Sequence, residues 1–310
     1  MRSKTNVFFL IFLCALLIFT AYVLLDTFVI VRRIEAVSEP QIMNQAVADT
    51  QSFSLLTAST QGSSGPEIVL TENYYNDGRV SVTITEERVG NTTVYVADVQ
   101  LSSADQLKTA FAENTYGRNV TDKTSAIAES VGAVLAINGD FYGSQQAGYV
   151  IRNGVLYRSS AKSGAEDLMI RADGSFAIIQ ETEITAQELL EGGAQNVFSF
   201  GPALIENGEI SVSEDDEVGR AKTSNPRTAI AALGELHYLF VVSDGRTAES
   251  EGLTLYELAV FLQGKAAQTA YNLDGGGSST MVFNGRVVNN PTTSGRGTKE
   301  RSVSDIVYIW

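Results

Sequence analysis

Four short polar segments carry the side chains best suited to chemistry, and each adjoins an apolar, strand-like run. They are Asn138-Gly139-Asp140 after AVLAI, Ser243-Asp244-Gly245-Arg246 after YLFVV, Asp274-Gly275-Gly276-Gly277-Ser278 after TAYNL, and Asn225-Pro226-Arg227-Thr228-Ala229 at the start of a strand. Aspartate can act as a nucleophile or general base, and arginine binds oxyanions through paired N–H donors. Glycine lets backbone N–H groups approach a ligand closely. The segments therefore predict a site at strand ends, where loops held by a rigid sheet often carry function.

The glycine-rich segment is the most informative of the four. Three consecutive glycines have high conformational entropy and exceed what a turn needs, whereas Asn138-Gly139 or Asp244-Gly245 alone is typical of an ordinary turn. The segment lacks the Gly-Lys-Ser/Thr ending of a phosphate-binding loop, and it is not Gly-x-Gly-x-x-Gly. No Gly-x-Ser-x-Gly elbow occurs in the chain. We therefore predict a functional loop at Gly275, Gly276 and Gly277 outside these motif classes.

Three other candidate patterns favour structural interpretations. Ser159-Ser160-Ala161-Lys162 fits Ser-x-x-Lys, but the Lys-Thr-Gly element of penicillin-binding enzymes does not follow. His237 alternates with apolar neighbours in ELHYLFVV, which favours a packed or surface strand histidine over a catalytic one. The acidic run at 214–217 predicts a solvated loop, because it lacks the spacing of a helix-loop-helix calcium site.

The residue counts exclude several classes of protein. The chain has 310 residues, one Cys, one His and a formal net charge of −14. A zinc site of several Cys and His ligands and an internal disulfide framework are both excluded. Nucleic acid is not expected as a partner, because a strongly acidic chain repels the phosphate backbone.

The N-terminus predicts a membrane anchor over residues 1–31. Val7–Leu25 is a run of 19 residues without a charge, close to the roughly 20 apolar residues that span a bilayer. The run exceeds the roughly 7–15 residues of a cleavable signal sequence and ends in bulky residues, which favours an uncleaved anchor. Basic residues flank it almost evenly, so orientation is weakly specified. We predict a single-pass cell-membrane protein whose C-terminal domain is extracytoplasmic.

The remainder reads as a linker followed by one domain. Residues 32–65 are rich in Ser, Thr, Gln and Ala, with a short helix predicted over Gln41–Ala48. Residues 66–310 form short β-rich runs joined at five hairpin dipeptides: Asp77-Gly78, Asn153-Gly154, Asp173-Gly174, Asn207-Gly208 and Asn284-Gly285. Helices are predicted over Asp122–Val131, Ala186–Glu191 and Leu255–Gln263, the last two behind capping boxes. The predicted fold is α+β: a single domain of mixed β-sheets with a few flanking helices, preceded by one transmembrane helix.

Taken together, the polar loops resemble those of the phosphodiester glycosidase family. The resemblance lies in INGDFY at 137–142, NPRTAIA at 225–231, SDGR at 243–246, GLTLYELA at 252–259 and YNLDGGGSSTMVFNG at 271–285. It extends from about Val94 to the C-terminal strand. Members of this family hydrolyse a sugar-1-phosphate diester at the sugar side, and bacterial members are often associated with exopolysaccharides. The resemblance therefore implies a hydrolase that releases a free sugar and a phosphate monoester from a cell-surface or exopolysaccharide phosphoglycan.

The resemblance also implies roles for the loop residues. Asp274 and Asp140 are candidates for nucleophile or general base, and Asp244 and Asn138 would orient carboxylates or sugar hydroxyls. The phosphodiester would be held by Arg227 and the amides of the glycine-rich segment, with help from Arg246 or Arg301. The adjoining Thr228 and Ser278 are further substrate-binding candidates. A phosphate leaving group is already acidic, so a strong general acid matters less than in most glycosidases.

A different hydrolase on the same fold is a weaker alternative, and two further points stay open. The first is a non-catalytic module that binds phosphate-linked wall polymers or assists their assembly, using the same arginine and N–H groups. The second concerns metals: no ligand spacing requires one, and a Ca²⁺ or Mg²⁺ ion between the aspartates is compatible with the acids. We favour the enzyme, because several acids beside the arginines exceed what anion binding needs.

Overall fold

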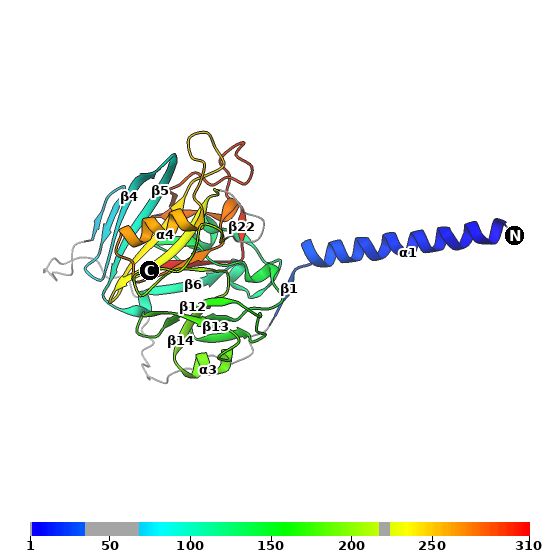
Figure 1. The fold of residues 1–310 in the computed structure, drawn as a ribbon, viewed down its shortest axis with the longest axis horizontal. Coiled ribbons are helices and arrows are strands. Elements are labelled where there is room, and N and C mark those ends of the chain that lie inside the picture. The colour runs from blue at the N-terminus through cyan, green and yellow to red at the C-terminus, as the bar shows by residue number, and fades with distance from the viewer. Residues whose placement is uncertain (1, 35–67, 217–223) are drawn as a thin grey trace, which may run out of the picture.

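The computed structural model describes residues 2–34, 68–216 and 224–310. The helix predicted over Gln41–Ala48 and most of the predicted linker lie outside these residues. Helix α1 (Arg2–Phe28) projects away from the body of the molecule (Figure 1). Its window Phe9–Asp26 has a mean hydropathy of 2.5 and is wholly exposed, so by length and composition it could cross a membrane.

A short strand joins this helix to the body. Strand β1 (Arg32–Arg33) pairs antiparallel with β7 (Gly117–Arg118). A side chain on Gly117 would collide with the Arg32 carbonyl, because a Cβ there would lie 2.2 Å from that oxygen. The Asn119 side chain donates a hydrogen bond of 2.9 Å to the Ile30 carbonyl. The first residues of the predicted linker are therefore docked on the body.

Besides the β1–β7 pair, three antiparallel sheets and one small ladder contain the described strands of the body (Figure 1). The nine-stranded sheet has the order β16-β15-β19-β17-β18-β5-β4-β3-β2; its strands are β2 (Val69–Leu70), β3 (Tyr74–Asn76), β4 (Val80–Val89), β5 (Thr92–Leu101), β15 (Ala203–Glu206), β16 (Glu209–Ile210), β17 (Arg227–Gly234), β18 (His237–Ser243) and β19 (Thr269–Leu273). The second sheet has the order β21-β20-β9-β23-β6; its strands are β6 (Leu107–Phe111), β9 (Leu135–Asn138), β20 (Met281–Phe283), β21 (Arg286–Val287) and β23 (Asp305–Ile309). The third has the order β11-β10-β14-β12-β13; its strands are β10 (Val150–Arg152), β11 (Val155–Arg158), β12 (Glu166–Arg171), β13 (Phe176–Gln180) and β14 (Ala194–Phe198). The ladder pairs β8 (Asp122–Lys123) with β22 (Ser302–Val303).

The helices of the body are short and cover the outer faces of the sheets. They are α2 (Thr124–Ser130), α3 (Ala186–Glu191) and α4 (Leu255–Gly264), with single 3₁₀ turns η1 (Ala104–Gln106), η2 (Ala112–Asn114), η3 (Tyr142–Ser144) and η4 (Gly276–Ser278). Helix α4 packs on the nine-stranded sheet, α2 on the second sheet and α3 on the third. The inner faces of all three sheets meet in one core, where Phe240, Tyr271 and Phe283 are almost wholly buried. Burying each such side chain contributes roughly 1.5–3 kcal/mol.

The α+β class is confirmed, and so is most of the predicted local structure. All five hairpin dipeptides connect adjacent antiparallel strands, and Asn153 and Asn207 adopt the positive φ that such turns require. Both predicted capping boxes are present, at Thr185 with Glu188 and at Thr254 with Glu257. One detail differs from the predicted mixed sheets: every strand pair among the described residues is antiparallel. Short hairpin loops impose that direction, since a parallel pair needs a crossover of a dozen residues or more.

Candidate active site

The pairing of neighbouring strands brings the predicted loops to one edge of the nine-stranded sheet. Strand β17 lies between β18 and β19 and is antiparallel to both, so its first residues are level with their last ones. Arg227 pairs with Ser243, and Thr228 pairs with Leu273. The segments that begin at Arg227, Asp244 and Asp274 are therefore neighbours in space.

Asn138 joins this edge to the second sheet. It is fully buried at the end of β9, and its Nδ2 donates to the Asp274 carbonyl oxygen at 2.6 Å. Its Oδ1 accepts from the Thr228 hydroxyl at 2.8 Å and from the Thr280 amide at 3.2 Å. The side-chain amide of Asn138 therefore links the end of β9, the start of β17 and the segment 274–280. We name these segments, together with the segment 243–246, the loop cluster.

Asp274 is the acid of the loop cluster in which only one carboxylate oxygen accepts hydrogen bonds from the described residues. Its Oδ2 accepts from the Ser278 hydroxyl at 2.5 Å and from the Arg301 guanidinium at 3.1 Å. Its Oδ1 accepts no hydrogen bond from the described residues, and 13% of the side chain is exposed. Burial raises the pKa of Asp274 above its usual value, while Arg301 and Ser278 oppose that rise.

Other segments lie so close to the three glycines of the loop cluster that a side chain at any of these positions would collide with them. A Cβ on Gly275 would lie 2.9 Å from the Pro226 carbonyl, one on Gly276 would lie 2.7 Å from the Arg246 guanidinium, and one on Gly277 would lie 2.5 Å from the Thr293 hydroxyl. Gly276 also has φ +62°, which disfavours any side chain. The Gly276 amide donates to the Pro226 carbonyl at 2.8 Å. The Gly276 amide is therefore already hydrogen-bonded within the protein, whereas the sequence suggested that all three glycine amides would bind the phosphodiester.

Two arginines lie over this loop with their side chains partly in solvent. Arg301 donates to the Ser278 hydroxyl and to Asp274, and 41% of its side chain is exposed. Arg246 donates to the Asn225 side chain and to the Thr293 carbonyl. Burial lowers the pKa of Arg246, and the positive charge of Arg301 lowers it further. The positive charges of Arg246 and Arg301 therefore interact, and Arg301 also contacts the Asp274 carboxylate. Two neighbouring guanidinium groups form a region suited to an anion.

The other predicted arginine lies beneath the surface. Arg227 is 3% exposed, its Nε donates to the Leu253 carbonyl at 2.8 Å, and its own amide donates to the Ser243 hydroxyl at 2.9 Å. The neighbouring Thr228 is fully buried and bonded to Asn138. Both residues therefore join the cluster from the core side.

Asp244 fixes the segment that follows β21. Its Oδ1 accepts from the Asn290 amide at 2.8 Å, and its Oδ2 accepts from the Asn290 side chain at 2.9 Å and from the Tyr95 hydroxyl at 3.4 Å. Asn289 joins the same group by donating to the Ser279 carbonyl at 3.0 Å. These contacts hold the residues that lead toward the Thr293 carbonyl, and hence toward Arg246.

Asp140 belongs to a buried ion network that the sequence did not reveal. Its Oδ2 accepts from the Arg152 guanidinium at 2.8 Å and from the Ser199 amide at 3.2 Å, and its Oδ1 accepts from the Tyr142 amide at 2.8 Å. Arg152 also donates to Asp305 at 2.8 Å. All three ionisable side chains are at most 2% exposed.

The Asp305 carboxylate of this network lies directly against Gly139, next to Asn138 of the loop cluster. No described residue donates a hydrogen bond to the Asp305 Oδ1, and a Cβ on Gly139 would lie 2.3 Å from that oxygen. Burial raises the pKa of Asp305, and Arg152 opposes that rise. For Arg152, burial alone would lower the pKa, but the two carboxylates more than offset it and raise the pKa. The only sequence signal was a charged residue inside each of two apolar strands, VIR and DIVYI.

Neither a metal ligand set nor the lone histidine falls within the cluster. In the described part of the chain, no group of three or more His, Cys, Asp or Glu side chains is placed to hold a metal ion. His237 lies at the start of β18, at the end of that strand away from the loop cluster, and its Nε2 lies 2.9 Å from the Asp98 carboxylate.

Comparisons with known proteins agree on one family. A model of the phosphodiester glycosidase family matches residues 131–310. The mouse (Mus musculus) N-acetylglucosamine-1-phosphodiester alpha-N-acetylglucosaminidase is 30% identical over 189 residues, covering 56% of this chain and 36% of the relative. An SPbeta prophage-derived uncharacterized protein of Bacillus subtilis is 28% identical over 199 residues, covering 63% of this chain and 30% of the relative. The chain thus spans about a third of the length of these curated relatives.

A solved structure shares the fold. The catalytic domain of the zebrafish N-acetylglucosamine-1-phosphodiester alpha-N-acetylglucosaminidase, auto-inhibited by its pro-peptide, superposes with a TM-score of 0.59 at 22% identity. The match covers 74% of this chain and 82% of that one.

Proposed function

The chain belongs to the phosphodiester glycosidase family, and from that premise we propose that it hydrolyses a glycosyl phosphodiester at the sugar side of the phosphate. The reaction breaks the bond between the anomeric carbon and the phosphate oxygen, and the phosphate leaves with the bonding electron pair. Water supplies a hydroxyl group to the anomeric carbon and, on balance, one proton to the solution or the phosphate. The products are a free sugar and a phosphate monoester.

The arrangement of Asp274 carries this proposal. One of its oxygens is fixed by Ser278 and Arg301, and the other accepts no hydrogen bond from the described residues. A carboxylate held in this way can attack an anomeric carbon, or accept a proton from the attacking water, without reorienting. Asp140 and Asp244 are less suited to that role, because both oxygens of each already accept hydrogen bonds.

Arg246 and Arg301 are the groups that we propose bind the phosphodiester. Both guanidinium groups reach solvent beside Asp274 and repel each other, so a shared phosphate would relieve that repulsion. As the phosphate leaves, its negative charge grows, and fixed guanidinium groups stabilise that charge more strongly in the transition state than in the substrate. The buried Arg227 supports the loops in this scheme, as Asn138 does.

The helix α1 suggests where the reaction takes place. Because α1 is long and apolar enough to span a bilayer, we propose that the chain is anchored in the cell membrane with its body outside the cytoplasm. Cell-surface or exopolysaccharide glycans linked through phosphate are then the accessible substrates. The β1–β7 pairing would keep the body close to the membrane surface.

Turnover of defined substrates tests the proposal. The full chain in detergent micelles is supplied with methyl phosphodiesters of glucose, galactose and N-acetylglucosamine, and free reducing sugar is measured. We expect release by the wild type and a loss on the order of 10³-fold or more in Asp274→Asn. Asp105→Asn, an exposed substitution in the first turn of η1, is the matched control and should keep full activity.

Two results would contradict the assignment. Turnover of Asp274→Asn at the wild-type rate would remove that residue from the chemistry. Binding of the phosphodiesters without turnover of any by the wild type would favour the non-catalytic binding module.

A further inference from the structure

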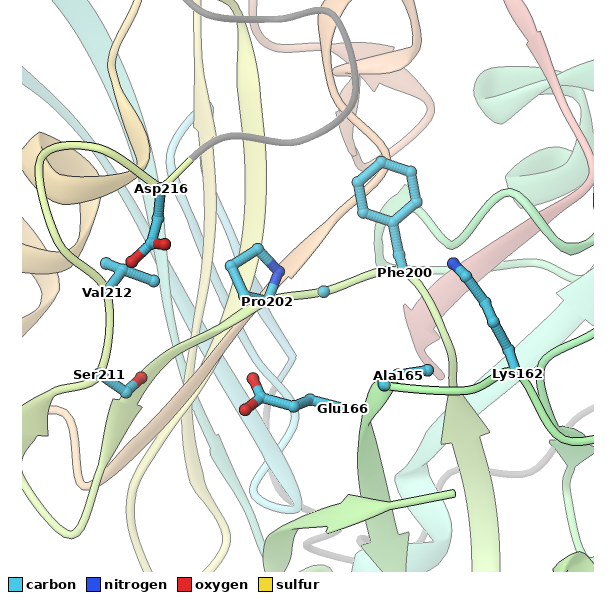
Figure 2. A pocket seen from close by; sticks show the side chains of 10 residues that line it. Lys162, Ala165, Glu166, Phe200, Pro202, Ser211, Val212 and Asp216 are labelled. Atoms are coloured by element: carbon cyan, nitrogen blue, oxygen red, sulfur yellow. The ribbon is translucent and has the colours of Figure 1, made fainter. Parts of the chain in front are cut away.

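A cavity of about 410 Å³ lies beside the loop cluster, between the third sheet and the start of β15. Its volume falls in the range of small-molecule sites, roughly 300–1,000 Å³. The lining side chains that matter here are Lys162, Glu166, Phe200, Pro202, Val212 and Asp216. Figure 2 shows Pro202 at the centre, with Val212 and Asp216 on one side and Phe200 and Lys162 on the other.

The cavity shares its wall with the proposed active site. The ring of Phe200 makes an edge contact with that of Phe141, with centroids 6.3 Å apart, and Phe141 directly follows Asp140 in the chain. The Ser199 amide, one residue before Phe200, donates to Asp140. The Gly201 carbonyl accepts from the Asn272 side chain at 2.8 Å, two residues before Asp274. The cavity wall at Phe200 and Gly201 is therefore in direct contact with the segments that carry Asp140 and Asp274.

The charges around the cavity are unfavourable for a phosphate. The Asp216 carboxylate accepts from both the amide and the hydroxyl of Ser213, which lowers the pKa of Asp216 and keeps it ionised. The Glu166 carboxylate lines the opposite wall, and Glu206 lies close enough that burial together with Glu166 raises the pKa of Glu206. Among the lining residues that the structure describes, Lys162 is the single basic side chain. The charges of these described residues disfavour an anion, in contrast to those of Arg246 and Arg301.

The polar and apolar groups of the cavity match a sugar ring. Fixed carboxylates accept hydrogen bonds from hydroxyl groups, and Ser211 adds a hydroxyl to the lining. Pro202, Val212 and the Phe200 ring offer apolar surfaces against which the C–H faces of a pyranose can pack. A few placed polar groups within an apolar wall are typical of small-molecule sites.

We infer that this cavity is a subsite for an uncharged sugar ring in the glycosyl half of the substrate, with the phosphate half at Arg246 and Arg301. The inference rests on the proposed function for the identity of the substrate, but sugar binding to the cavity does not require turnover. Neutral sugars should be accepted, whereas glucuronate and glucose 6-phosphate should be excluded by the carboxylates. The residues around Pro202 therefore determine which sugar is released.

A cavity-filling variant tests the subsite directly. Ala165 lines the cavity, so Ala165→Trp would occupy it, and the exposed Ala161, which does not line it, provides Ala161→Trp as the matched control. Binding of glucose, galactose, N-acetylglucosamine and glucuronate to the full chain is measured by saturation-transfer NMR. We expect at least one neutral sugar to bind, with about tenfold or greater weakening in Ala165→Trp and no change in Ala161→Trp. If Ala165→Trp fails to fold, Ser211→Trp on the opposite wall replaces it.

The outcomes separate this inference from the proposed function. Neutral-sugar binding that is unchanged in the filled variant, absent in the wild type, or matched by glucuronate would overturn the subsite. Sugar binding that is lost in Ala165→Trp, in a wild type that hydrolyses no phosphodiester, would support the subsite and contradict the enzyme. In an active enzyme, Ala165→Trp should raise KM for the glycosyl phosphodiester while inhibition by inorganic phosphate stays unchanged.

Discussion

Two arginine–aspartate groups adjoin the loop cluster, and they differ in burial and in the number of their ionic contacts. Arg152 bridges Asp140 and Asp305 in a network whose side chains are at most 2% exposed. Arg301 contacts Asp274 and Ser278 at the surface of the loop cluster, with 41% of the arginine side chain exposed. The two groups are linked through the backbone, because the Asp274 amide donates to the carbonyl of Gly139, the residue before Asp140, at 3.2 Å.

This difference in exposure leads us to propose that the buried Arg152 group stabilises the fold and that the exposed Arg301 group takes part in the reaction. Desolvating three charges is tolerable only when each is paired, and removing one partner leaves an uncompensated buried charge. Arg152 therefore holds Asp140, and through it the loop after β9, in one position. Arg301 can exchange its contacts for those of a ligand at little cost in desolvation. We expect substitutions in the buried network to act on folding, and substitutions at the exposed group to act on turnover.

The largest effect is expected at Arg152. Arg152→Met should lower the free energy of unfolding by about 3–5 kcal/mol, because it leaves Asp140 and Asp305 as unpaired buried acids. Denaturant unfolding measures the loss. Arg301→Met, the same change at the exposed group, should alter the free energy of unfolding by less than about 1 kcal/mol. Equal losses in the two variants would break the distinction between the groups.

The second effect concerns the rate and its pH dependence. Arg301→Gln should slow sugar release by roughly 10–100-fold, because one guanidinium donor to the leaving phosphate is removed. Arg301 opposes the rise in the pKa of Asp274 that burial causes, so its loss raises that pKa further. In the proposed mechanism Asp274 acts as the carboxylate, so the acidic limb of the rate profile should move to higher pH.

The pH–rate profile of the full chain checks this shift. Arg171→Gln, at a half-buried arginine of β12 away from the loop cluster, serves as the control and should leave the limb in place. An acidic limb that does not move in Arg301→Gln would show that Asp274 and Arg301 are not coupled in the reaction.

The smallest effect is expected at Asp167, a buried acid outside the Arg152 network, and it concerns the pH dependence of stability. Burial, with the nearby Glu181 carboxylate, raises the pKa of Asp167 to about 9. The folded protein therefore binds a proton there that the unfolded chain releases near pH 4. Stability from this group is present below the unfolded pKa and is lost as pH rises toward 9.

Asp167→Asn replaces the protonated acid by a neutral isostere. At pH 8 it should stabilise the fold by about 1 kcal/mol or more, which raises the melting temperature by roughly 2–4 °C. The gain should vanish near pH 4. Asp215→Asn, at an exposed site, is the control. A melting temperature of Asp167→Asn at or below that of the wild type at pH 8 would contradict the assignment of a protonated Asp167.

Local signals in the sequence predicted much of the fold. Asn-Gly and Asp-Gly turns, such as Asn153-Gly154, specify their hairpins because the required positive φ is a property of the residue itself. Thr254 and Glu257 specify the start of α4 for a similar reason. The ends of β9, β18 and β19 were also predicted, since an apolar run that meets a polar glycine loop marks a strand end.

The missing parts depend on contacts between residues far apart in the chain. Arg152 and Asp305 are separated by 153 positions, so no local pattern pairs them. The three glycines of the loop cluster were interpreted as an amide cradle; the structure adds a second reason for glycine, because Pro226, Arg246 and Thr293 fill the space that side chains would need. The cavity beside Pro202 is formed by segments that carry no common motif. The roles of Asp274, Arg246 and Arg301 stay predictions until they are measured.

The most direct test of the account is the position of bond cleavage. The full chain is incubated with a glycosyl methyl phosphodiester in water enriched in ¹⁸O, and the methyl phosphate product is examined by ³¹P NMR, where an ¹⁸O bonded to phosphorus shifts the resonance. Attack at the anomeric carbon, aided by Asp274, predicts a phosphate monoester without ¹⁸O, because its oxygens all come from the substrate. Incorporation of ¹⁸O into the monoester would show attack at phosphorus and would contradict the proposed glycosidase mechanism.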